Sequence, residues 1–406
     1  MNKNKKIIYK SYIQKKFLNF KNNKKMNQNF FDIFNDITFN LNSTKSVFNC
    51  LSNEYEFNFK IKDLNRFKKF NTIVVIGMGG SILGSEAIYF FFKRRIKKDF
   101  IFLNNIDEDE LQRIKRKKKL SKLLFIIISK SGNTIESLSN IRALKIIKKN
   151  CKNIIIISEK NQNPLYLLSK KMNIFHIEHK NYIGGRYSVL SEVGMVPAIL
   201  MGLNISRIRK NLLSHFRARN KNYLKDSSTK LATILKRKKL NNLIFFNYVP
   251  QLNKFLYWSQ QLIAESLGKK GKDFLPIISP APRDHHSLLQ LYLDGPQDKL
   301  FYVFSSDTGN KKKIRSNIFE RKFNFLNNKS LNQIKIAQKN AFLKTLKKKR
   351  IPFREFKITA LNEEVLGELF SYFILETVIV GKLANINPFD QPAVEEVKIK
   401  TKKILS

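Results

Sequence analysis

Glu265 and His286 are the two side chains of this chain best suited to moving a proton. A carboxylate and an imidazole are the groups most easily tuned to exchange protons near neutral pH. Gln261 lies one helical turn before Glu265, and Gln290 follows His286 by the same step. This set could act on a small polar substrate. From the spacing alone, Glu265 could instead be an ordinary solvated glutamate and His286 a purely structural histidine. His285 lies beside His286, so one of these two histidines could have only a structural role.

Residues 77–81, Gly-Met-Gly-Gly-Ser, form a glycine-rich turn between an apolar run and a helical pattern. Backbone N–H groups and the helix dipole at such a turn would face an anion. The turn lacks the third glycine of a dinucleotide fingerprint, because Ile82 stands at that position, and it has no Walker lysine. An anion other than a dinucleotide or ATP is the expected ligand; a tight turn that needs glycine for its geometry alone is the alternative.

Residues 129–134, Ser-Lys-Ser-Gly-Asn-Thr, follow a second apolar run and also open a helical pattern. Three hydroxyl groups, one amide and a helix N-terminus could together hold a phosphate monoester. Thr134 could instead, or in addition, cap the helix. Both turns would lie at the carboxyl edge of one parallel sheet, where ligands of α/β proteins gather, so binding is the favoured interpretation.

Arg186 follows Gly184 and Gly185, which would let the backbone approach a ligand while the guanidinium donates to an oxyanion. A solvated arginine after a glycine turn is the simpler alternative. The sequence Asn-Pro-Phe-Asp-Gln at 387–391, followed by Lys398, adds further polar side chains near the C-terminus.

The elements that must position these residues alternate between short apolar runs and longer helical patterns, which is typical of parallel sheets with crossover helices. We expect one α/β unit with strands at 72–76, 100–103, 123–129, 153–158 and 174–177, and helices at 81–92 and 134–148. We expect a second unit with strands at 242–249, 300–305 and 353–358, and helices at 252–267 and 362–384. The predicted division is a basic extension (1–60), a first domain (61–205), a bridge (206–240) with a helix at 230–238, a second domain (241–385) and a C-terminal segment with a helix (386–406).

The charge of the chain is strongly positive, with 77 Lys and Arg against 31 Asp and Glu and a formal net charge of +46. This field would attract anions, nucleic acid included. The frequent use of Lys, Asn, Ile and Phe, whose codons are rich in A and T, explains much of the charge without a polyanionic partner. Because the chain has no nucleic-acid-binding motif, we predict only weak, salt-sensitive binding of that kind.

Cysteine usage and hydropathy exclude further classes. Cys50 and Cys151 have no neighbours at zinc-ligand spacing, so we predict no metal site and a reducing compartment. The apolar runs fall far short of the roughly 20 residues of a membrane helix, so we predict no membrane association. The Lys-rich first 31 residues lack the features of a cleavable targeting signal and are expected to be a partly ordered lead-in.

The combination of motifs resembles the glucose-6-phosphate isomerases in their shorter bacterial form, which contain two sugar-isomerase (SIS) domains. The resemblance extends over about residues 65–400 and is carried by Gly-x-Gly-Gly-Ser (77–81), Ser-Lys-Ser-Gly-x-Thr (129–134), Gly-Gly-Arg-Tyr-Ser (184–188), Glu-Ser-x-Gly-Lys (265–269) and Asn-Pro-Phe-Asp-Gln (387–391). It implies an aldose–ketose isomerisation of glucose 6-phosphate and fructose 6-phosphate through an enediolate, in glycolysis and gluconeogenesis.

The resemblance also implies roles for individual residues. Glu265 would move the proton between C2 and C1, His286 would open the sugar ring, Arg186 would stabilise the enediolate, and Lys398 would assist ring opening. The substrate-binding set would be Gly79, Gly80, Ser81, Ser129, Lys130, Ser131, Thr134, Gln261 and Gln391. In the family the histidine reaches the site from the neighbouring subunit, so a homodimer is implied, with no metal, no cofactor and a cytoplasmic location.

Two alternatives stay open within this resemblance. The Ser-Gly-Asn-Thr sequence at 131–134 is also similar to archaeal-type isomerases that accept mannose 6-phosphate as well. A sugar-phosphate sensor built on the same domains would need the phosphate cradle but not Glu265, His286 and Lys398. Of the two adjacent histidines, the four-residue step to Gln290 favours His286 as the ring-opening residue.

Overall fold

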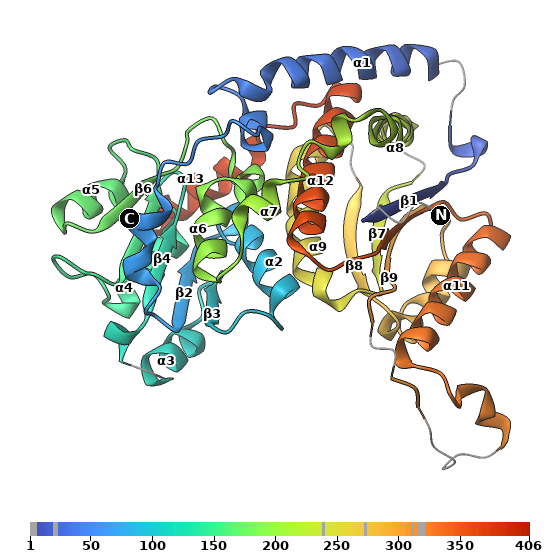
Figure 1. The fold of residues 1–406 in the computed structure, drawn as a ribbon. Coiled ribbons are helices and arrows are strands. Elements are labelled where there is room, and N and C mark those ends of the chain that lie inside the picture. Colours follow the sequence, from blue (N-terminus) through green and yellow to red (C-terminus); the bar gives the residue numbers. More distant parts are fainter. Residues whose placement is uncertain are drawn as a thin grey trace.

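Two five-stranded sheets, each flanked by helices, form the framework of the protein in a computed structural model (Figure 1). The structure describes residues 6–18, 23–117, 119–237, 240–271, 274–309, 312–314 and 321–406. The two sheets lie on opposite sides of a layer of helices. This arrangement confirms the predicted α/β class, with mainly parallel sheets between helices.

The first sheet has the order β3-β2-β4-β5-β6 and is parallel throughout. Its strands are β2 (Thr72–Ile76), β3 (Asp99–Leu103), β4 (Leu124–Ile128), β5 (Ile154–Ser158) and β6 (Phe175–Glu178). The helices between them are α2 (Leu83–Phe92), α3 (Glu108–Lys117), α4 (Ile135–Leu144) and α5 (Pro164–Lys171). Strands β2, β4 and β5 are buried on both faces, which explains their continuous apolar sequences.

The second sheet has the order β1-β10-β9-β7-β8. Its strands β7 (Asn242–Asn247), β8 (Leu275–Pro280), β9 (Lys299–Ser306) and β10 (Phe353–Ile358) are parallel, and β1 (Ile7–Tyr12) pairs antiparallel with β10. The helices of this part are α9 (Asn253–Leu267), α10 (Leu289–Asp294), α11 (Leu331–Lys348) and α12 (Glu363–Leu383). The predicted strands and main helices of both units are therefore present, with small differences at their ends.

The N-terminal segment is more structured than the expected lead-in. Besides β1, it contains the long helix α1 (Asn23–Phe39), which packs on α8 (Ala218–Arg237) and α12. Phe30, Phe34 and Ile37 of α1 are fully buried in the main hydrophobic core. These residues therefore belong to the folded body, where we had expected a partly ordered extension.

Three predicted helices differ from the observed ones. The helix expected at 134–148 ends at Leu144, because Lys145 adopts a left-handed conformation with φ of 53°. The helix expected at 230–238 begins much earlier, as the 20-residue α8; residue 238 lies outside the described residues. The helix expected from residue 81 is preceded by a 3-10 turn over Gly79–Ser81 and begins at Leu83.

The helical layer between the sheets contains α2, α6 (Glu192–Leu200), α7 (Ile205–Arg209), α9 and α12. Close packing of α2 on α9 joins the two sheet units, and buried side chains from both units form one continuous core cluster. The C-terminal helix α13 (Pro392–Leu405) differs from these, since it has no buried residue. Among the described residues, no helix is both long and apolar enough to cross a membrane.

Candidate active site

The candidate site is formed where the carboxyl ends of β2 and β4 meet helix α9. Residues 76 and 127 are register partners in adjacent parallel strands, so the loops that follow β2 and β4 lie side by side. A Cβ placed on Gly77 would lie 3.0 Å from the carbonyl oxygen of Ile128. The two motifs that the sequence analysis singled out, 77–81 and 129–134, are therefore neighbours.

The turn at 77–81 depends on glycine at two positions. Gly79 has φ of +51°, and a Cβ there would lie 2.5 Å from Nε2 of Gln261. A Cβ on Gly80 would lie 2.2 Å from the carbonyl carbon of Gly185. Any side chain at these positions would collide with α9 or with the Gly-Gly-Arg segment, so the glycines bring three motifs into contact.

The loop at 129–134 forms a group of polar side chains at the end of β4. The hydroxyl groups of Ser129 and Thr134 are 2.9 Å apart, and Oγ of Ser131 donates to Oδ1 of Asn133 at 2.7 Å. Thr134 is the N-cap residue of α4, but its side chain makes no capping hydrogen bond. The expected cap is thus not formed by the side chain, and the hydroxyl points toward Ser129 at the strand end.

Lys130 is held at the side of this loop. Its ammonium donates to the carbonyl of Asn181 at 2.6 Å and lies 3.7 Å from the carboxylate of Glu159. His179 is buried nearby, and its Nδ1 is 2.9 Å from the carbonyl oxygen of Lys180. Burial, with a smaller contribution from the positive charge of Lys130, lowers the pKa of His179 to about 4. His179 is therefore neutral at pH 7.

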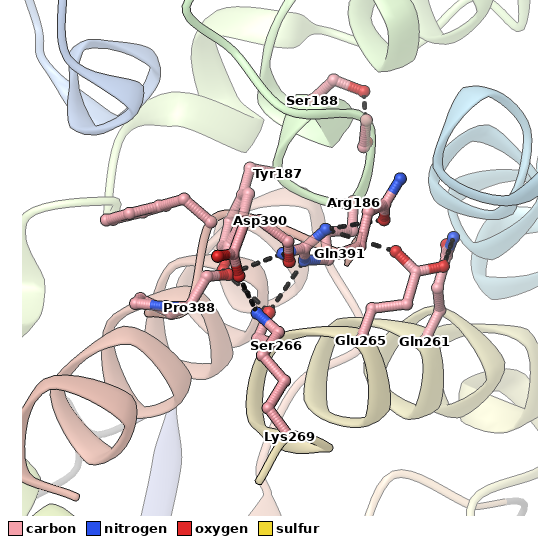
Figure 2. Close-up of polar contacts among 12 residues, drawn as sticks. Arg186, Tyr187, Ser188, Gln261, Glu265, Ser266, Lys269, Pro388, Asp390 and Gln391 are labelled. Carbon is pink, nitrogen blue, oxygen red and sulfur yellow. Dashed lines mark hydrogen bonds and ion pairs between the residues drawn. The ribbon is translucent and has the colours of Figure 1, made fainter. Parts of the chain in front are cut away.

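Glu265 lies in the last turn of α9 with a hydrogen-bond donor on each carboxylate oxygen (Figure 2). Gln261, one turn earlier, donates to Oε1 at 2.8 Å, and Arg186 donates to Oε2 at 3.3 Å. The side chain of Glu265 keeps 29% of its surface exposed, against 4% for Arg186. The carboxylate is thus oriented by two donors while one side stays accessible, as a proton-transferring base requires.

Arg186 is the central residue of the site (Figure 2). Its other donors bind Oγ of Ser266 at 2.8 Å, Oε1 of Gln391 at 3.0 Å, and the backbone carbonyls of Pro388 and Asp390 at 2.6 and 3.1 Å. The contact with Glu265 is the longest of the five. Arg186 therefore both orients the carboxylate and fixes the segment 388–391 against α9.

Tyr187 and Lys269 hold the same segment, and Ser266 joins Tyr187 to Arg186; none of the three was given a role from the sequence. The Tyr187 hydroxyl lies 2.8 Å from Oγ of Ser266 and donates to the carbonyl of Pro388 at 2.7 Å. Lys269 donates to the carbonyl of Asn387 at 2.5 Å and pairs with Asp390 at 2.7 Å, which lowers the pKa of that carboxyl group. All three residues lie inside the motifs found in the sequence, so membership of a motif was the signal that could have identified them.

His286 and Lys398 lie outside this network. His286 is exposed, directly after a 3-10 turn that follows β8. Lys398 lies on the exposed helix α13 and pairs with Glu395, three residues away, at 2.6 Å. The structure of the single chain therefore joins Gln261, Glu265, Arg186 and Gln391, with the loop at 77–81 against them and the loop at 129–134 beside that loop. No contact among the described residues joins His286 or Lys398 to Glu265.

The two adjacent histidines have different environments. Nε2 of His285 is 2.6 Å from the hydroxyl of Tyr248, and its ring packs against Phe246 and Phe342. Burial is the main cause that lowers the pKa of His285. His285 is thus a packed structural residue, while the side chain of His286 remains available at the surface.

A cavity of about 400 Å³ lies beside the site. Its walls include Lys130, Gly184 and Tyr187 from the first unit, and Phe389 from the C-terminal segment. The N-terminal segment supplies another part of the wall, from Asp36 to Phe48. Sequence reasoning gave no indication that this segment borders the site. Within the described residues, no group of three or more His, Cys, Asp or Glu side chains could hold a metal ion.

Comparison with known proteins agrees with this geometry. The sequence profile of the family described as "Phosphoglucose isomerase" matches residues 58–406. The chain belongs to this family. The resemblance seen in the motifs is therefore confirmed, and the protein is an isomerase by family.

The relatives cover most of the chain. A glucose-6-phosphate isomerase of Methanocaldococcus jannaschii is 32% identical over 350 residues, covering 83% of this chain and 86% of the relative. A glucose-6-phosphate isomerase of Mycoplasmopsis pulmonis is 31% identical over 373 residues, covering 87% of each chain.

Solved structures show the same fold. A hypothetical protein of Thermus thermophilus superimposes with a TM-score of 0.82 at 21% identity, covering 98% of this chain and 100% of the other. A glucose-6-phosphate isomerase of Chlamydia trachomatis gives a TM-score of 0.68 at 20% identity, covering 85% of this chain and 72% of the other.

Proposed function

We propose that the protein interconverts glucose 6-phosphate and fructose 6-phosphate, with Glu265 as the base that transfers the proton. The observation that carries the proposal is the position of Glu265, fixed by Gln261 on one oxygen and by Arg186 on the other. The neighbouring loop at 129–134 supplies the hydroxyl groups that a sugar phosphate needs. Family membership and the names of the relatives agree with this activity.

In the proposed reaction, Glu265 removes the proton from C2 of the open-chain aldose. The C2–H electron pair forms the C1–C2 double bond, and the carbonyl oxygen at C1 receives the charge of the enediolate. The hydroxyl proton of C2 passes to the oxygen at C1, and return of the carbon-bound proton from Glu265 to C1 then gives the ketose, with its carbonyl at C2. No electron leaves the substrate, so the step needs proton transfers and one nearby cation but no redox partner.

Arg186 is the proposed cation beside the developing charge. Its guanidinium is buried, and all five of its donors have acceptors in the chain. The donor of the longest contact, from Nη1 to Glu265, is the one that a substrate oxygen could most easily share. A cation already held in place by protein hydrogen bonds needs no reorganisation when charge develops.

The phosphate is proposed to bind at Ser129, Ser131 and Thr134, with Lys130 beside them. Gly79, Gly80, Ser81, Gln261 and Gln391 are proposed to contact the sugar. Binding energy from the phosphate end would orient the reacting carbons, an effect worth up to about 7 kcal/mol of the barrier in well-oriented systems. A phosphate-binding sensor would need this part of the site but not the arrangement around Glu265.

A homodimer is part of the proposal, because His286 is exposed and makes no contact with Glu265 of its own chain. Two large apolar side chains on the flanking elements are also exposed: Tyr257 of α9 and Leu291 of α10, at 47% and 49%. An apolar surface of this kind is typical of a subunit interface. We propose that this surface pairs with a second copy, and that His286 of each chain opens the sugar ring in the site of the other.

Mixing two impaired variants tests the shared site. Homodimers of Glu265→Gln and of His286→Asn should each be at least about tenfold less active than the parent, but co-expression with two different tags should give mixed dimers with one intact site. At random assembly the pool should recover about a quarter of the parent activity, because half of the dimers are mixed and each has one working site. No recovery in purified mixed dimers would show that both residues act within one chain.

The test of the activity itself is conversion of glucose 6-phosphate to fructose 6-phosphate by the purified protein after EDTA treatment. Turnover that survives EDTA is expected, since the proposed step uses only protein side chains. Mannose 6-phosphate run in parallel measures whether the enzyme also accepts that sugar. Tight binding of both sugar phosphates without turnover would instead support the sensor. The cytoplasmic location and the lack of a specific nucleic-acid partner stay predictions.

A further inference from the structure

A second cavity, of about 1250 Å³, lies at the outer edge of the first sheet. We call it the β6-edge pocket; its walls come from residues 58–69, residues 150–160, helix α5 and strand β6. Strand β6 is the last strand of its sheet, on the side away from the second sheet (Figure 1). The pocket contains none of the residues assigned to the isomerase site, so its chemistry requires a separate explanation.

The walls of the β6-edge pocket are strongly cationic. Among the described residues, its basic side chains are Arg66, Lys69, Lys152, Lys160 and Lys170, and its only carboxylate is Glu178. This five-to-one ratio exceeds the 77 to 31 of the whole chain. Cations that line a concave surface reinforce one another's field, so the pocket favours a ligand with several negative charges.

Aromatic rings lie among these cations. Arg66 packs its guanidinium over the rings of Phe175 and Phe67, at 4.2 and 5.0 Å from their centroids, which holds the cation in place. The ring of Tyr166 lies 5.1 Å from that of His176. Tyr166 and His176 are only half-buried, so their ring surface borders the pocket. Phe175, the neighbour of His176 in β6, points to the opposite face of the sheet, where Arg66 covers it.

His176 contributes a neutral ring and not a sixth cation. Its Nε2 lies 3.0 Å from Oγ of Ser158 in the adjacent strand. Burial lowers the pKa of His176 to about 4. The pocket therefore combines a cluster of positive charge with uncharged aromatic surface, which is the pair of features that a phosphorylated nucleoside uses.

We propose that the β6-edge pocket binds a nucleoside triphosphate, with its phosphates against the lysines and its base against the rings of Tyr166 and His176. Inorganic triphosphate shares the charge but has no base. A nucleoside without phosphate has the base but no charge. Comparing the three ligands therefore separates the two parts of the proposal.

The experiment is isothermal titration of the full-length protein with ATP, tripolyphosphate and adenosine at physiological salt, first without and then with saturating glucose 6-phosphate. ATP is expected to bind at least about tenfold more tightly than tripolyphosphate, because each stacked base contributes measurably. Adenosine is expected to bind most weakly. Equal affinity for ATP and tripolyphosphate, loss of ATP binding when glucose 6-phosphate is added, or no ATP binding would each overturn the proposal.

Charge-matched variants distinguish this pocket from the general basicity of the chain. Replacing Lys152, Lys160 and Lys170 together by Gln should weaken ATP binding about tenfold or more, since three cations are lost from one site. The control removes three lysines from another basic hollow, at Lys10, Lys344 and Lys347. It should change affinity less than about twofold. Equal losses in both triple variants would show that binding follows net charge alone.

A last variant tests the aromatic contribution. Tyr166→Leu should reduce the affinity for ATP to near that for tripolyphosphate and leave tripolyphosphate unaffected. Thermal unfolding of each variant confirms that it is folded. Because titration does not depend on turnover, the result stands apart from the outcome of the isomerase assay.

Discussion

The inner and outer residues of the candidate site are held in different ways. Arg186 is buried and binds Glu265 and Gln391 directly, at 3.3 and 3.0 Å. His286 and Lys398 are exposed. Among the described residues, Lys398 pairs only with Glu395, a neighbour on its own helix. One chain thus fixes the proton-transfer group in advance, while the proposed ring-opening groups depend on further contacts.

Glu265→Gln should cause the largest loss of activity. The amide keeps the shape of the side chain but cannot accept a proton, so kcat should fall by about 10²- to 10⁴-fold with little change in KM. Steady-state kinetics measure this effect. The control is Glu110→Gln on α3, outside the site, which should leave kcat unchanged. A Glu265→Gln enzyme with near-normal kcat would remove Glu265 from its role.

Arg186→Lys should have the next largest effect, on both activity and stability. An ammonium has three donors and cannot replace a planar group that binds five acceptors. We expect a fall of about 100-fold in kcat/KM and a loss of about 2 kcal/mol in the free energy of unfolding. Kinetics and urea denaturation measure the two effects. Arg207→Lys, at an exposed position, is the control, and equal behaviour of the two variants would contradict the central position of Arg186.

Comparing His286→Asn with His285→Asn should distinguish a catalytic histidine from a structural one. Loss of the ring-opening group should lower kcat by roughly 10- to 100-fold at unchanged stability, since the side chain is exposed. His285→Asn should do the reverse, because it removes the contact with Tyr248 but no catalytic group. Enzyme kinetics and thermal unfolding of the two variants compare the effects. A reversed result would exchange the roles of the two histidines.

Lys398→Ala should have a smaller effect, about tenfold on kcat, because the residue is proposed only to assist ring opening. The control, Lys402→Ala on the same exposed helix, should have no effect. If both variants behave like the parent enzyme, helix α13 takes no part in the reaction, and the contrast between inner and outer residues becomes sharper.

The smallest effect on activity at neutral pH is expected for His179→Asn. This variant tests the buried surroundings of Lys130 through the pH dependence of stability. The pKa of His179 lies near 4 in the folded protein, below its ordinary value, so the unfolded chain binds protons more readily. The stability due to this group is complete above pH 6.5 and is lost as the pH falls toward 4.

Asn keeps a donor near the position of Nδ1 but does not titrate. Between pH 7 and 4.5 the variant should therefore lose less stability than the parent protein, by about 2 kcal/mol. Urea denaturation at the two pH values measures this difference. Parallel stability curves for parent and variant would contradict the buried, neutral state of His179.

The elements that were predicted well from the sequence are those that a local pattern of apolar residues and glycines determines. Strands β2, β4 and β5 are uninterrupted apolar runs because both faces are buried, and glycine turns end two of them. Strand β8 was missed because Pro276 and Pro280 argue against a strand. It tolerates both prolines because it is an edge strand, where one side of the ladder needs no partner.

The parts of the site that could not be predicted depend on the backbone. Arg186 binds carbonyl groups of residues 388 and 390, and a carbonyl has no sequence signature. Capping of α4 was the alternative use considered for the Thr134 side chain, but tertiary contact with Ser129 determines its direction. The motifs indicated which segments of the chain meet at the site. Which atoms make the contacts could be learned only from the folded structure.

The pairing of β1 with β10 has a consequence for the order in which the protein folds during synthesis. Register partners such as Ile7 and Ile358 come from nearly opposite ends of the chain, while every strand of the first sheet lies between residues 72 and 178. The first sheet can form as soon as its stretch has left the ribosome. The N-terminal strand must stay unpaired until almost the whole chain is made. The lysines around it would help to keep that waiting segment from associating with other nascent chains.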